Sequence, residues 1–337
     1  MTAASRSTIL RLAAAQSTTY FRPSPFFLAA ATGRELGNWA RQSDANEREL
    51  AHKMENGVDA LLDLALDRCG LTMGRIRELY LMRFSIINPV TDIIDKCVGD
   101  QWYQTENFWD GGVSDAYTID SEPHKTIFHL AIYGELFGPD FEAVLNQDTT
   151  SRQLNLQTRL EYIKYCIPDF ATTCMGFNYD KEADWPDPRR QIKITGPYTT
   201  DNTGRPRYHK NHNVALTWVL FSSRWRPHWD RMRVKAGEDF EEGFKDDWWY
   251  VEGEHQERSW RQRMWEAVMV CQGLDGLAMM RPELQDAWIG KVKEWREKIS
   301  RLEKEPDIIK VQRQATLDYP WLLGDLRICA GGYVGGT

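Results

Sequence analysis

Apolar positions recur every three or four residues along much of the N-terminal half of the chain. After a polar cap at Ser43 or Asp44 and before Gly70, one such run consists of Leu50, Met54, Val58, Leu61 and Ala65. This spacing places apolar side chains on one face of a helix, so we predict a single amphipathic helix over the run.

Three further runs in this half predict helices with recognisable ends. One starts near Arg75, and we expect Pro89 to end or kink it, because proline lacks the backbone donor that a helix needs. Another starts with Ser121 as its cap, and we expect Pro139 and the glycine before it to end it. The third covers residues 156–167.

The C-terminal third carries two longer apolar stripes. The first consists of Trp260, Met264, Val268 and Cys271, and the second of Leu284, Trp288, Val292, Trp295, Ile299 and Leu302. Both follow helical spacing, and acid–base pairs at i,i+4 (Glu294 with Lys298, Glu297 with Arg301) indicate an exposed opposite face. We therefore expect Trp260, Trp288 and Trp295 in the core.

Between the two helical regions, residues 168–213 are rich in proline and glycine. Only residues 191–195 alternate in the manner of a strand. A chain of 337 residues exceeds the size at which single cores stop growing. The predicted fold is mainly α, with two helical lobes (43–167 and 214–337) around an irregular connector (168–213) that could hold a short β-hairpin.

The N-terminal segment, residues 1–42, is predicted to be a basic tail or a targeting segment. Residues 1–34 contain four arginines and no acid, which is typical of a mitochondrial transit peptide as well as of a flexible tail. We expect a cytoplasmic protein, with the mitochondrial matrix as the alternative. No apolar run reaches the length of about 18 residues that a membrane span needs, so no span is expected.

The net charge and the cysteine content limit which cellular compartment and which classes of partner are expected. The net charge of −7 disfavours attraction of the whole protein to nucleic acid or to an anionic membrane. The six cysteines are dispersed, which is typical of reduced thiols in an intracellular protein. Neither a nucleotide-binding glycine loop nor a zinc-binding motif is present, and no cofactor or metal is predicted.

Tryptophan is the most unusual component, with 14 residues in the chain. Residues 189–235 carry eleven Lys or Arg against two acids, and residues 236–257 carry nine acids against one lysine. The predicted binding residues lie at or near this junction: Trp225, Trp229, Trp248, Trp249, Arg224, Arg226 and Tyr208. Such residues could stack on nucleic acid or on a protein partner, or they could pair with one another within the chain.

Histidines provide the only candidate catalytic groups: His209 and His212 in the breaker-rich region, and His129 on a predicted helix. Imidazole can act as a general base near neutral pH, but no nucleophile is marked by a known motif. The opposing interpretation is that His129 is a core residue.

Three functions follow in order of preference. The first is a soluble intracellular binding or scaffold protein that uses a Trp- and Arg-rich surface for a protein contact or for self-association. The alternative is an enzyme that acts on a small aromatic or isoprenoid-like molecule in a helical cavity, with histidine as acid and base. The third is binding of single-stranded nucleic acid or a nucleotide through the basic stretch 189–235.

Overall fold

The fold is mainly α, as predicted. The computed structural model describes residues 25–82, 84–85, 88–89, 123–166, 231, 234–237, 240, 259–281 and 283–309. Helices account for 77% of these residues, and no strand occurs among them. The strand expected at residues 191–195 lies outside the described residues.

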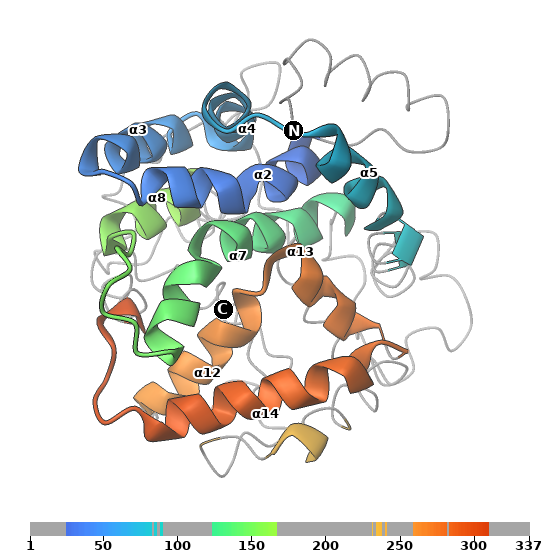
Figure 1. Cartoon of the computed structure of the whole chain (residues 1–337), viewed down its shortest axis with the longest axis vertical. Helices are drawn as coiled ribbons and strands as arrows, with labels where there is room; N and C mark the ends of the chain where they lie inside the picture. The colour runs from blue at the N-terminus through green and yellow to red at the C-terminus, as the bar shows by residue number, and fades with distance from the viewer. Residues whose placement is uncertain are drawn as a thin grey trace, which may run out of the picture.

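The N-terminal part of the fold contains four helices: α2 (Pro25–Ala40), α3 (Asp44–Met54), α4 (Gly57–Arg68) and α5 (Met73–Met82). Figure 1 shows α3 and α4 at one end of the molecule, above α2. The helix expected from Arg75 is α5, which begins two residues earlier and ends at Met82, well before Pro89.

The run around Leu50 to Ala65 forms two helices, so the prediction of one continuous helix was wrong. Ser43 caps α3 as expected, because its hydroxyl accepts a hydrogen bond of 3.1 Å from the Asn46 amide. All five apolar positions are buried. The break is at Gly57, whose φ of +80° is readily adopted only by glycine and turns the chain so that α4 packs beside α3.

The expectation of an N-terminal tail was wrong for residues 25–40, which form helix α2. Phe27, Ala30, Ala31 and Leu36 are buried in the core, and α2 packs extensively on α4 and α7. The small side chains of the run from Ala29 to Ala31 allow this close packing. From Pro25 onward, the predicted basic segment is therefore part of the folded domain.

The long helix α7 (Pro123–Leu145) continues through Pro139, where the prediction had ended it. Pro139 has no amide hydrogen to donate to the carbonyl of Glu135, and Figure 1 shows α7 as two segments that meet at an angle. The helix continues beyond the bend, and Arg41 of α2 donates to the neighbouring Leu136 carbonyl at 2.7 Å. Phe141, buried just beyond the bend, adds apolar contacts.

The remaining elements complete one core. They are α8 (Leu156–Cys166), α12 (Trp260–Val270), α13 (Gly273–Gly276), η6 (Leu277–Met280), α14 (Gln285–Arg301) and η7 (Asp307–Ile309). Both C-terminal stripes form helices as predicted. Helices from each predicted lobe contribute to the same hydrophobic cluster. The connector at 168–213 lies outside the described residues, so the domain boundaries stay a prediction.

Two glycines of α7 allow the closest approach between the N- and C-terminal helices. A Cβ atom at Gly134 would lie 2.2 Å from the Gly273 nitrogen, and one at Gly138 would lie 2.6 Å from the Cys271 carbonyl oxygen. Neither contact leaves room for a side chain, so the turn between α12 and α13 rests directly on the α7 backbone. Within the described part of the chain, no helix has both the length and the apolar character of a membrane span.

Candidate interaction surface

Tryptophans of α12 and α14 divide between the core and its edge. Trp265 and Trp295 are buried, at 1% and 5% exposure. Trp260 and Trp288 pack against the core but are only half-buried. The core prediction is therefore confirmed for Trp295, whereas Trp260 and Trp288 each leave part of the indole ring at the surface.

Lys291 covers two of these indoles. Its Nζ lies 4.8 Å from the ring centroid of Trp288 and 5.2 Å from that of Trp295. The three residues share one side of α14 because they are three and four positions apart. A cation over an indole contributes about 0.5–1 kcal/mol at an exposed site, so this stack orders a surface patch more than it stabilises the fold.

Arg261 makes the corresponding contact on α12. Its guanidinium lies 4.2 Å from the Trp260 ring centroid, and its Nη2 donates to the Leu302 carbonyl at 3.0 Å. Leu302 is the C-cap of α14, where free carbonyls and the helix dipole favour a cation. Arg261 thus joins the start of α12 to the end of α14.

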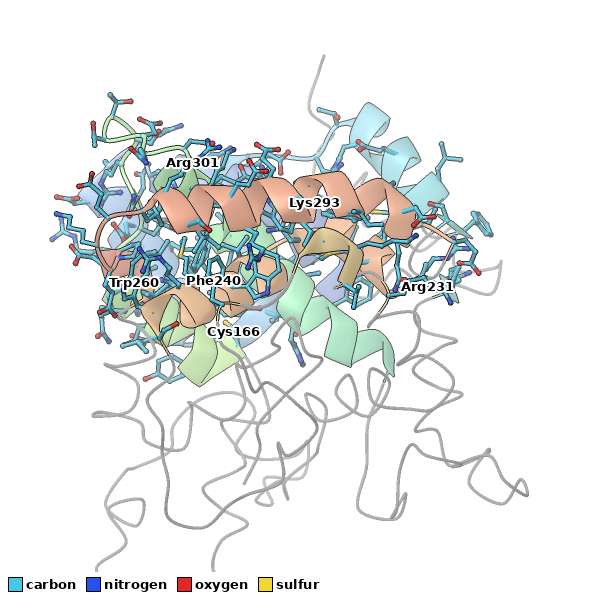
Figure 2. All side chains as sticks on the ribbon, turned by 90° about the horizontal axis from the view of Figure 1, so that it is seen from below. Cys166, Arg231, Phe240, Trp260, Lys293 and Arg301 are labelled. Atoms are coloured by element: carbon cyan, nitrogen blue, oxygen red, sulfur yellow. The ribbon has the colours of Figure 1, made fainter. Side chains whose placement is uncertain are left out.

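Phe240 contacts both helices, through Trp265 of α12 and Arg296 of α14. The Arg296 guanidinium lies 4.9 Å from the Phe240 ring centroid, and Phe240 meets Trp265 edge to face at 6.2 Å. Figure 2 shows Phe240 and Trp260 beside α12 and α14. Gly237 has a φ of +114°, and a Cβ atom there would lie 3.1 Å from Cδ of Arg296, which is a tight contact. We call Trp260, Arg261, Trp288, Lys291, Arg296 and Phe240 the aromatic–cationic face.

Most predicted site residues lie outside the described part of the chain. They are Tyr208, His209, His212, Arg224, Arg226, Trp225, Trp229, Trp248 and Trp249. Their roles in binding and catalysis stay predictions. The aromatic–cationic face has the same combination of basic and aromatic side chains, and it lies mostly on described helices whose contacts the structure gives.

His129 is the described member of the predicted catalytic set. It is fully buried on α7, and its carbonyl accepts a hydrogen bond of 2.8 Å from the Tyr162 hydroxyl. This position agrees with the interpretation of His129 as a core residue.

Two other buried ionisable groups of α7, Glu135 and Asp140, are each tied to a neighbouring element. Arg41 of α2 pairs with Asp140 at 2.7 Å, and Arg34 pairs with Glu135 at 3.3 Å. Glu135 also accepts the Leu274 amide at 2.8 Å, which caps α13 in place of a local side chain. Burial raises the pKa of both carboxyl groups despite their arginine partners.

A second buried cluster surrounds Arg159 of α8. Its guanidinium donates to the Tyr133 hydroxyl at 2.9 Å and to the Ile308 carbonyl at 2.5 Å, and the Phe141 ring centroid lies 4.9 Å away. Burial raises the pKa of Tyr133 and of the nearby Cys271 to about 12. A thiol with such a pKa stays protonated at neutral pH and is a poor nucleophile, so these contacts serve the fold.

Sequence reasoning missed several members of the face, for two different reasons. Lys291 lies three residues from Trp288 and four from Trp295, so the helical spacing alone could have predicted their stack. Phe240 and Arg296 are far apart in the sequence, and no local pattern links them.

No protein-family model matches the chain, and comparisons with curated proteins and with solved structures find no match either.

Proposed function

We propose that this chain is an intracellular binding or scaffold protein that uses its Trp- and Arg-rich C-terminal surface for a protein contact or for self-association. The observation that supports the proposal best is the aromatic–cationic face, where Trp260 and Trp288 are half-buried under Arg261 and Lys291. Tryptophan and arginine dominate the energetic centres of protein interfaces, because they combine large apolar area with directional polar groups.

The cation–indole contacts also favour binding on energetic grounds. Trp288 and Lys291 are held in place by neighbours on the same helix, so little conformational entropy remains to be lost when a partner binds. A protein partner could bury the rest of both indoles and strengthen the cation contacts by removing water.

Cysteine chemistry supports the compartment in this proposal. Cys69, Cys166 and Cys271 are free thiols, and burial raises the pKa of each. Thiols of this kind persist in reducing compartments, such as the cytoplasm or the mitochondrial matrix.

The proposal is tested with tagged full-length chain purified from its native host under gentle conditions. Trp288→Ala and Lys291→Ala should lower the recovery of a co-purifying protein, or of untagged chain, by about tenfold while the folded state is retained. Circular dichroism and thermal unfolding report on the fold.

A matched control is Leu81→Ala, which truncates an apolar side chain of α5 that is 67% exposed. It should leave recovery unchanged. Equal recovery for Trp288→Ala and the unaltered chain would refute the proposal, as would equal losses for the face variants and the control variant.

A further inference from the structure

Helix α4 exposes a row of carboxylates. Its exposed residues are Asp59, Asp63, Asp67 and Arg68, so the three aspartates recur every fourth position on one face. Glu55, exposed just before α4, extends the acidic character toward α3. Over α3 and α4 together, residues 44–68 carry seven acids against three Lys or Arg. We call Glu55, Asp59, Asp63 and Asp67 the acidic face.

Helix stability does not account for this row. Like charges at i,i+4 repel each other along a helix, and all three aspartates stand in that relation. Asp67 also lies in the last turn of α4, where the helix dipole disfavours negative charge.

An opposite charge pattern is present on and beside α14. Together with Arg231 and Lys235, which lie on a short helical segment next to it, α14 carries seven Lys or Arg against three acids. Lys235 is joined to α14 by its ion pair with Asp286 at 2.9 Å. Lys293 and Arg301 are exposed on α14, where Arg301 also pairs with Glu297 at 3.3 Å, and Figure 2 shows Lys293 and Arg231 on these neighbouring segments. We call Arg231, Lys235, Lys293 and Arg301 the basic face.

The two faces cannot neutralise each other within one copy. Figure 1, drawn with the longest axis vertical, shows α3 and α4 at the top of the described helices and α14 at the bottom. At physiological ionic strength, exposed charges are screened beyond about 8 Å, so only direct contact between copies brings these charges together.

We propose that the basic face of one copy binds the acidic face of a second copy, in a head-to-tail contact. This inference rests on the self-association branch of the proposed function and gives it two surfaces. Because the faces differ, the contact is heterologous, and repeated addition forms open chains or closed rings.

The dimensions indicate a weak, salt-sensitive contact. A helix of 17 residues is about 25 Å long, so one face of α14 covers less than the roughly 800 Å² per partner of a stable interface. Association should therefore depend on protein concentration and should weaken steeply as salt is added.

Sedimentation velocity on the full chain tests this dependence, at about 10 to 200 µM protein and at about 50 mM and about 500 mM NaCl. We expect the mean mass to rise with concentration at low salt and to remain near 39.2 kDa at high salt. Lys293→Glu with Arg301→Glu, or Asp59→Lys with Asp67→Lys, should each lower the association constant about tenfold or more. Thr149→Glu with Gln153→Glu, on an exposed loop outside both faces, should leave it unchanged.

Mixing the two charge-reversed variants distinguishes this contact from a symmetric one. Neither variant should associate with itself, because each has two faces of like charge. An equal mixture should associate again, through the two intact faces and through the two reversed faces, which are once more opposite in charge, so its mean mass should rise well above 39.2 kDa. A mixture that stays monomeric, association that ignores salt, or a chain that is monomeric under all conditions would overturn the inference.

These outcomes are separate from the test of the proposed function. A monomeric chain that still loses a co-purifying protein upon Trp288→Ala would refute head-to-tail association and leave the aromatic–cationic face as a surface for a different protein.

Discussion

Glu135 and Asp140 of α7 form similar ion pairs in different surroundings. The side chain of Arg34, the partner of Glu135, is 44% exposed, whereas that of Arg41, the partner of Asp140, is 12% exposed. An arginine that reaches water stays solvated when its carboxylate partner is removed. A buried arginine then has neither water nor a carboxylate to offset the free-energy cost of its desolvation.

Asp140→Ala should therefore destabilise the chain more than Glu135→Ala does. We expect a loss of about 2 kcal/mol for Asp140→Ala, because the buried Arg41 and the Leu154 amide both lose their acceptor, and about 1 kcal/mol for Glu135→Ala, because Arg34 reaches water. Urea unfolding followed by tryptophan fluorescence measures both values. A larger loss for Glu135→Ala would show that solvent access to the arginine does not govern the cost.

These carboxyl groups also determine the sign of a pH effect. Burial raises their folded-state pKa above the ordinary values of 4.5 for Glu135 and 3.8 for Asp140, so the folded chain binds protons more readily than the unfolded chain. Their stabilising contribution is complete below those ordinary values and is lost as the pH rises through the folded-state values.

Unfolding free energies measured from about pH 4 to pH 7 should therefore show a loss of stability with rising pH that the double variant Glu135→Gln/Asp140→Asn lacks. The comparison with the double variant removes the contributions of all other groups. A chain that loses stability through these two residues as the pH falls would contradict this assignment.

At the scale of elements, hydrophobic periodicity predicts which faces are buried but not where a helix breaks. Leu50 and Leu61 are buried as expected although they belong to different helices, because the break at Gly57 preserves both apolar faces. Pro139 lies within a helix although it cannot donate to the Glu135 carbonyl, and Arg41, nearly one hundred residues away, donates to the neighbouring Leu136 carbonyl at the bend. A contact of this range is absent from any local pattern.

The same limit applies to the candidate site. Helical spacing is sufficient to place Trp288, Lys291 and Trp295 together. The contact of Phe240 with Arg296 and Trp265 depends on the tertiary fold, so sequence alone could predict only part of the aromatic–cationic face.

The glycines of α7 and α14 provide a matched pair of substitutions. Gly134→Ala places a Cβ atom 2.2 Å from the Gly273 nitrogen and must push the turn away from α7, at a cost of about 2 kcal/mol or more. Gly290→Ala has no heavy atom within 4 Å of its Cβ and should stabilise α14 by about 0.5–1 kcal/mol. Thermal unfolding of the two variants compares them, and destabilisation by Gly290→Ala would contradict the open surroundings of that site.

For the whole molecule, the buried position of α2 limits any processing of the N-terminus. A cut after residue 34 would remove the buried residues Phe27, Ala30, Ala31 and Thr32 from contact with α4 and α7. A chain that starts at residue 35 should fail to unfold cooperatively, whereas one that starts at Pro25 keeps the whole helix. Calorimetry on both chains tests this difference, and equal stability would show that α2 is dispensable.

The central claim is that the aromatic–cationic face meets another protein molecule. Hydroxyl-radical footprinting of the full chain tests it, by comparison of dilute purified protein with the same chain in concentrated native extract. We predict that oxidation of Trp260 and Trp288 falls severalfold in the extract, because the exposed part of each indole becomes covered, while oxidation of the exposed Leu81 stays unchanged. Equal oxidation of both tryptophans in the two samples would contradict the claim.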